Sequence, residues 1–199
     1  MRVVKKPSIL GAALAAALLF CMVGVAGADK VEDFKEAAGK TGCEAIPYSS
    51  ERSECKSEQE KKNAACKDLG CERPKVEKLL ETLKEKRQNL ADAKSRNNQA
   101  AIPDLEKAIK ELEDALKARK AEAQRRVERC EDCIEARENV QEVFLEVKAK
   151  VKGESDPALK PYVDQLVQHY DKGAQEHVKP LDEAKAALAN CKWVASISI

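Results

Sequence analysis

Cysteine is the residue type in this chain with the widest choice of chemistry. Seven cysteines follow the N-terminal segment: Cys43, Cys55, Cys66, Cys71, Cys130, Cys133 and Cys191. Thiols at these spacings can form disulfides, bind Zn²⁺ as thiolates, or exchange disulfides with other proteins. An oxidising compartment favours disulfides over thiolate ligands. Because the N-terminal segment indicates export, as argued below, we predict disulfides.

The closest pair of cysteines, Cys130 and Cys133, has the CxxC spacing of thiol–disulfide oxidoreductases. In those proteins the first cysteine lies at the N-terminus of a helix, where the dipole lowers the thiol pKa. Here the motif falls inside a long predicted helix, and Glu131 and Asp132 act to raise a thiol pKa. Redox activity, or a zinc site built from the Cx4C and Cx2C pairs, remains an alternative to structural disulfides.

Two histidines, His169 and His177, flank Gly173 and are candidate metal ligands. Two solvated side chains beside a turn are the simpler interpretation. The sequence contains no glycine-rich phosphate loop, no zinc-protease helix motif and no nucleophile elbow. We therefore expect no catalytic residue, no cofactor and no metal, and a protein that is not an enzyme.

Residues 1–28 have the features of a signal peptide. Three basic residues come first, Arg2, Lys5 and Lys6, followed by the apolar run 9–25 and then Ala26-Gly27-Ala28. The small-x-small end matches a cleavage site, and the apolar run is at the lower limit for spanning a bilayer. An uncleaved anchor and a lipoprotein signal at Cys21 are the alternatives, and the bulky Phe20 disfavours the second. We expect cleavage before Asp29 and a periplasmic or secreted protein.

The remaining chain, residues 29–199, has almost balanced charge. Removal of the three basic residues takes the formal net charge from +1 to −2. Interleaved charges of this kind create no field that would hold nucleic acid or an anionic membrane, and no later segment could span a bilayer. Charged residues make up 36% of the chain and aromatic residues 4%, which is typical of long helices or coiled coils. We predict an all-α fold with a protein partner.

Two apolar seams predict an antiparallel helical hairpin. The first is Val76, Leu80, Leu83, Arg87 and Leu90, and the second is Leu105, Ile109, Leu112 and Leu116. Their spacing of four and three residues is the two-per-heptad repeat of a coiled coil. Residues 95–99 form the turn between them. In this coiled-coil stalk, residues 74–128, positions whose numbers add to about 200 lie opposite each other.

The register of the hairpin predicts how the cysteines pair. Two disulfides staple the helices: Cys71–Cys130 and Cys66–Cys133. A third disulfide joins Cys43 to Cys191, with Cys43–Cys55 as the alternative. Because the number of cysteines is odd, one thiol is left over. We assign it to Cys55, either free or bonded to another chain or a ligand.

Further helices complete the predicted domain, residues 29–199. They are a helix ending near Leu69 before Gly70, a helix over 104–152, and helices over 157–170 and 174–191 separated by a turn at Gly173. We predict that residues 43–73 and 129–192 pack as a small helical bundle at the base of the stalk. The apolar tail 193–199 is predicted to be non-helical. It either folds over the bundle or offers Trp193, Ile197 and Ile199 to a partner as an added strand.

These features together predict a function. We expect an exported, non-enzymatic helical protein that acts as a structural or protein-interaction module, an adaptor or spacer, of the cell envelope. A thiol–disulfide-active protein and a metal- or ligand-binding protein are the alternatives. Self-association into a homo-oligomer is also compatible with the seams.

Overall fold

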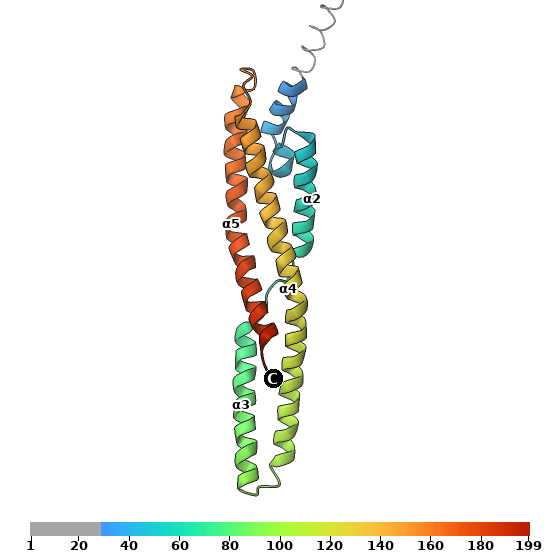
Figure 1. The fold of residues 1–199 in the computed structure, drawn as a ribbon, viewed down its shortest axis with the longest axis vertical. Coiled ribbons are helices and arrows are strands. Elements are labelled where there is room, and N and C mark those ends of the chain that lie inside the picture. The colour runs from blue at the N-terminus through green and yellow to red at the C-terminus, as the bar shows by residue number, and fades with distance from the viewer. Residues whose placement is uncertain (1–28) are drawn as a thin grey trace, which may run out of the picture. The chain divides into compact units, whose positions relative to one another are not determined.

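The structure is a computed structural model, and it describes residues 29–199 (Figure 1). The predicted signal peptide, including Cys21, lies outside these residues. Residues 29–199 are largely helical and contain no β-strand, which confirms the all-α class. The helices are residues 29–38, η1 (Gly42–Ala45), α2 (Ser49–Ala65), α3 (Arg73–Ser95), α4 (Ile102–Lys152) and α5 (Lys160–Ser196). None of these helices carries an apolar stretch long enough to cross a bilayer.

The chain forms two compact units. Unit 1 contains residues 29–56 and 143–173 of the described chain, and unit 2 contains residues 57–142 and 174–199. Helices α2, α4 and α5 each contribute residues to both units. This division differs from the predicted one, in which a stalk of residues 74–128 rises from a base.

Aromatic side chains fill the core of unit 1. Every aromatic residue of the described chain except Trp193 belongs to this unit. Phe34 meets the ring of Tyr48 edge-on with ring centres 5.8 Å apart, and Phe144 stacks on Tyr170 at 6.2 Å. The hydroxyl of Tyr170 donates a hydrogen bond of 2.5 Å to the carbonyl of Ala45. The polar end of this buried tyrosine is therefore satisfied.

Helix α5 is continuous through Gly173, so the predicted turn at this residue is wrong. A Cβ atom at Gly173 would lie 3.3–3.4 Å from ring atoms of Phe144. Glycine is needed here because the aromatic ring packs directly against the helix backbone. Pro180 also lies inside α5 without ending it. The helix reaches Ser196, so the predicted non-helical tail is also wrong in its first half.

Gly173→Leu tests this packing. The leucine side chain would occupy the space of the Phe144 ring, and overpacking of this kind costs about 1–3 kcal/mol. We expect a net loss of about 2 kcal/mol in the free energy of unfolding, measured by urea denaturation of residues 29–199. Gly70→Ala is the matched control, since a Cβ there meets nothing within 4 Å. Equal effects of the two substitutions would contradict the packing explanation.

Glu154 connects three segments of unit 1. Its carboxylate accepts hydrogen bonds from Lys30 Nζ at 2.7 Å and from the Tyr48 hydroxyl at 2.9 Å, and its side chain is 17% exposed. Lys150 Nζ lies 4.0 Å from the centre of the Tyr48 ring. Burial acts to raise the pKa of Glu154, but the two hydrogen-bond donors outweigh it and hold the pKa below its ordinary value.

This lowered pKa predicts a pH-dependent contribution to stability. A carboxyl whose pKa is lower in the folded chain stabilises the fold above its unfolded pKa, and the stabilisation is lost as pH falls through the folded pKa. We expect Glu154→Gln to cost about 1–2 kcal/mol at pH 7. The cost should shrink once the pH falls below the unfolded pKa of a glutamate, about 4, and disappear as the pH falls through the lower pKa of the folded carboxyl. Urea denaturation at pH 7, 5 and 3 measures it. Glu60→Gln, at an exposed position of α2, is the control, and a cost that persists at pH 3 would rule out the ionised carboxylate as its source.

In unit 2, α3 runs antiparallel to the first part of α4 (Figure 1). Arg87 pairs with Glu113 at 2.7 Å and Lys94 pairs with Glu106 at 3.0 Å. Both ion pairs join residues whose numbers add to 200. The turn between the helices contains Asn97 in the left-handed region, with φ of 56°, a conformation common just after a helix C-terminus.

The core of unit 2 is thin and aliphatic. One buried cluster draws its members from α3, α4 and the C-terminal end of the chain: Val76, Leu83, Leu116, Ala123, Val194 and Ile197. Leu80, Ile109 and Leu112 pack against this cluster but stay partly exposed. Two packed helices alone leave part of an apolar seam in contact with water. The seam between α3 and α4 is therefore incompletely covered.

Candidate functional site

Residues 66–72 connect α2 to α3 within unit 2, and we call them the crossing segment. Helix α2 ends at Ala65 rather than near Leu69. The left-handed residue after the helix is Asp68, with φ of 52°. The residue after the helix, Cys66, is bonded to α4.

Two disulfides hold the two ends of the crossing segment. Cys66 is bonded to Cys133 of α4 with a Cα–Cα distance of 4.9 Å, and Cys71 is bonded to Cys191 of α5 at 5.1 Å. The first bond coincides with the pairing predicted from the register. The bonds join residues 67 and 120 positions apart, so each of them closes a long loop.

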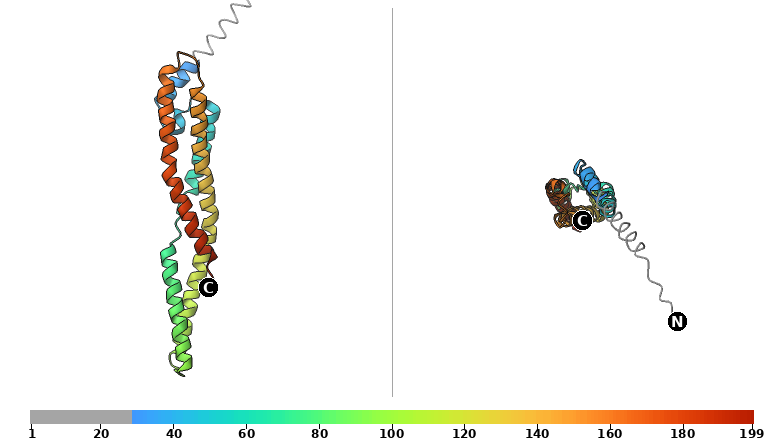
Figure 2. Two further views of the ribbon diagram at one scale, coloured as in Figure 1. Left: turned by 60° about the vertical axis from the view of Figure 1, so that its left-hand side comes forward. Right: turned by 90° about the horizontal axis from the view of Figure 1, so that it is seen from above.

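The predicted pair Cys71–Cys130 is wrong, and Cys130 is a buried free thiol. The reason is the continuity of α5, which runs beside α4 in both views (Figures 1 and 2). Lys192 pairs with Glu131 at 2.8 Å, and this contact brings Cys191 to the level of Cys130. A reversal inside α5, as predicted, would have carried Cys191 away from this level.

The third disulfide joins Cys43 to Cys55 in unit 1, with a Cα–Cα distance of 5.5 Å. This is the alternative pairing of the sequence analysis. The predictions of a Cys43–Cys191 bond and of a free thiol at Cys55 are wrong. The chain reverses at Pro47 between η1 and α2, which sets Cys43 against the second turn of α2.

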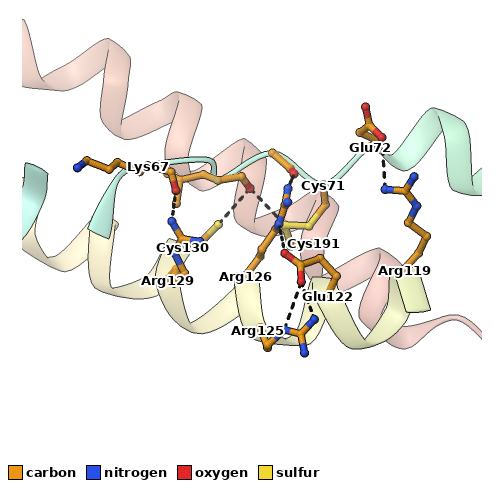
Figure 3. A network of polar contacts seen from close by, with 12 residues as sticks. Lys67, Cys71, Glu72, Arg119, Glu122, Arg125, Arg126, Arg129, Cys130 and Cys191 are labelled. Atoms are coloured by element: carbon orange, nitrogen blue, oxygen red, sulfur yellow. Dashed lines mark hydrogen bonds and ion pairs between the residues drawn. A yellow bond between two sulfur atoms is a disulfide. The ribbon is translucent and has the colours of Figure 1, made fainter. Parts of the chain in front are cut away.

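Side chains of α4 bind the backbone of the crossing segment (Figure 3). Arg129 donates a hydrogen bond to the carbonyl of Lys67, and Arg126 donates one to the carbonyl of Gly70. Arg126 also donates to Glu122 at 2.8 Å, which fixes its guanidinium. Carbonyls that have no helical partner are thus satisfied by two arginines one turn apart.

The carbonyl oxygen of Leu69 contacts both the free thiol of Cys130 and the Cys71–Cys191 disulfide. The Sγ atom of Cys130 lies 3.6 Å from this oxygen and can donate a weak hydrogen bond to it. The Sγ atom of Cys191 lies 3.4 Å from the same oxygen as a contact only, because a disulfide sulfur carries no hydrogen. Burial raises the pKa of the Cys130 thiol, while Arg129 and Arg126 act to lower it.

A cavity of about 610 Å³ opens beside this cluster. Seven of its lining residues carry charge or sulfur: Asp68, Cys71, Glu72, Arg119, Glu122, Arg126 and Arg129. Hydrogen bonds from Arg125 and Arg126 lower the pKa of Glu122 to about 2. Cys71 therefore faces a charged, water-accessible space, whereas Cys191 is fully buried.

Arg126 and Arg129 were not among the predicted site residues. Arg126 precedes Cys130 by four residues and Arg129 precedes Cys133 by four residues. Residues four apart share a face of a helix. An arginine one turn before each cysteine was the signal available in the sequence.

The candidate metal ligands do not form a metal site with other residues. His177 has a pKa lowered first by burial and then by the positive charges of Lys62 and Arg137, and such charges also repel a metal cation. Across residues 29–199, no group of three or more His, Cys, Asp or Glu side chains is arranged to hold a metal ion. Of the four cysteines considered for zinc, three are in disulfides and Cys130 remains.

The partner-binding candidates of the tail are packed into unit 2. Ile197 is 7% exposed, and Ile199 is partly buried against the same cluster. The guanidinium of Arg73 lies 4.6 Å from the centre of the Trp193 ring. Lys120 Nζ donates a hydrogen bond of 2.8 Å to the carbonyl of Ile197. The tail therefore follows the folded alternative and does not offer a free strand.

Loop closure predicts which disulfide matters most to stability. We expect the double substitution Cys71→Ala and Cys191→Ala to lower the free energy of unfolding by about 4 kcal/mol. The cost is not larger because the Cys66–Cys133 bond shortens the loop that the Cys71–Cys191 bond closes. The double substitution Cys43→Ala and Cys55→Ala opens a shorter loop and should cost about 3 kcal/mol. Guanidinium denaturation of residues 29–199 without reductant measures both. The reverse order would show that local strain or packing, rather than chain entropy, governs the contribution of these bonds.

Comparison of the chain with known protein families, with curated proteins and with solved structures found no match. A functional assignment therefore has to come from the residues and their geometry. The candidate site is the crossing segment together with the groups that contact it: two disulfides, two arginines of α4 and the free thiol of Cys130.

Proposed function

We propose that this protein is an exported, non-enzymatic helical module of the cell envelope that acts as a structural or protein-interaction element. In this proposal α3 and the first part of α4 form a coiled-coil hairpin that docks on a partner helix. The observation that carries it is the partly exposed seam of Leu80, Ile109 and Leu112 on a helix pair that is fixed covalently at the start of α3.

The surroundings of the seam support docking of another helix. A seam repeated at four and three residues can accept a third helix by coiled-coil packing. Ion pairs such as Arg87–Glu113 flank the seam and can set the register and orientation of the added helix. A second copy of this chain and a different helical protein both fit this surface.

The disulfides support the proposed compartment. Three of them join cysteines in residues 29–199, and such bonds persist in oxidising compartments outside the cytosol. They fit an exported protein that keeps its fold without a large core. The same bonds argue against the redox reading of the CxxC motif, because Cys133 is bonded to Cys66 and not to Cys130.

Site-specific photo-crosslinking in cells that express the full chain tests the proposal. A photoreactive residue is introduced at Gln88 in α3 or at Lys107 in α4, both at exposed positions, and at Glu60 in α2 as the control. We expect both α3 and α4 positions to capture the same protein, and Glu60 to capture several-fold less of it. Adding Leu112→Asp should abolish this capture while the disulfides still form.

Two outcomes would overturn the proposal. One is capture from Gln88 and Lys107 that does not exceed capture from Glu60. The other is capture that survives Leu112→Asp undiminished, since docking would then not use the apolar seam.

A further inference from the structure

We propose that Cys130, Cys71 and Cys191 form a disulfide-exchange site, in which Cys130 displaces Cys71 from Cys191 and delivers the Cys71 thiol to the adjoining cavity. The disulfide then joins α4 to α5, and the crossing segment keeps Cys66–Cys133 as its tether. This inference is independent of the proposed docking function.

The geometry brings the attacking thiol to the disulfide. Cys130 Sγ and Cys191 Sγ contact the same oxygen, that of Leu69, at 3.6 Å and 3.4 Å, so the two sulfurs cannot be further apart than these distances together. Figure 3 shows the three cysteines gathered beside the crossing segment. The contact of Lys192 with Glu131 holds α5 level with α4 at this point. The attacking thiol and the attacked disulfide therefore lie against the same backbone group.

The exchange is balanced without an added oxidant. Cys130 Sγ gives up its proton, which is balanced in net terms by the proton that the departing Cys71 sulfur takes up, and forms a bond to Cys191 Sγ. The bond between Cys191 and Cys71 breaks, and Cys71 leaves with the electron pair as a thiolate that takes up a proton from water. One disulfide and one thiol are present before and after the step.

The surroundings decide which sulfur is attacked. Cys71 lines the cavity, whose arginines Arg119 and Arg126 are paired with Glu72 and Glu122. A Cys71 thiolate is released into this water-accessible space, where it can be solvated, and this makes Cys71 the better leaving group. Attack on Cys71 instead would release Cys191 as a thiolate at a fully buried position. Burying a charge without a paired partner is unfavourable, so attack on Cys191 is favoured.

The exchange changes which cysteine carries the free thiol, and with it the exposure of that thiol to water. Cys130 is a fully buried thiol, whereas a Cys71 thiol would open onto a cavity of about 610 Å³. The exchange therefore converts an inaccessible thiol into one that a small reagent can reach. It also frees the end of the crossing segment where α3 begins.

Tryptic peptides distinguish the two states. Four tryptic peptides carry Cys66, Cys71, Cys130, Cys133 and Cys191: residues 63–67, 68–75, 130–137 and 186–192. Peptide 68–75 stays whole because the Arg73–Pro74 bond resists trypsin. In the starting state 63–67 is linked to 130–137, and 68–75 is linked to 186–192. After exchange, 63–67, 130–137 and 186–192 form one three-peptide species, and 68–75 is released.

The experiment incubates native residues 29–199 at pH 8 with N-ethylmaleimide, followed by non-reducing digestion and mass spectrometry. We expect labelled 68–75 and the three-peptide species to accumulate together, because alkylation of Cys71 removes it from the equilibrium. Cys130→Ala, with unchanged circular dichroism, should reduce both signals at least tenfold. Label on 130–137 with 68–75 still linked to 186–192, or no label at all, would overturn the proposal.

Cys71→Ala gives an independent test, because it leaves Cys130 and Cys191, the two cysteines that the exchange joins, without any other partner in the site. We expect oxidised glutathione to join Cys130 to Cys191 in this folded variant, which links 130–137 to 186–192. If both thiols stay reduced while the circular dichroism remains helical, the two sulfurs do not meet and the exchange site is disproved.

Discussion

The crossing segment is the constraint on which unit 2 depends. A chain that leaves a helix has carbonyls without a helical partner, and other donors must satisfy them. Here Arg126 and Arg129 bind two of these carbonyls, and Cys130 meets that of Leu69. The disulfides at both ends then prevent the segment from leaving. Together these contacts set the point at which α3 begins beside α4.

Disulfides compensate for the thin core. The buried cluster of unit 2 consists of aliphatic residues and contains no fully buried aromatic side chain, so each residue contributes little buried area. A bundle of this kind gains much of its stability by restricting the unfolded chain. Unit 1 is stabilised mainly by burial of large side chains. Phe34, Phe144 and Tyr170 supply large buried surfaces, and the disulfide of this unit closes only a short loop.

Local patterns in the sequence predicted the helices, and the register of α3 against α4 was predictable because the apolar residues repeat every three or four positions. Non-local features were not. Gly173 reads as a helix end in sequence, and only the packing of the Phe144 ring explains why the helix continues. Because a turn was predicted at Gly173, Cys191 was predicted at the wrong height along the bundle, and the partner of Cys71 was predicted wrongly as a result. The arginines that bind the crossing segment were missed because solvated arginines on helices have the same spacing.

The bond between Cys71 and Cys191 sets a temporal order on the biogenesis of the molecule. Ribosomes make proteins from the N-terminus, and Cys191 lies within the last turns of α5. Cys71 must wait until residue 191 has been synthesised before its final partner exists, whereas Cys130 is synthesised well before that. A nascent chain halted before Cys191 would offer Cys71 only earlier partners, so the covalent attachment of the crossing segment to α5 cannot precede the synthesis of that helix.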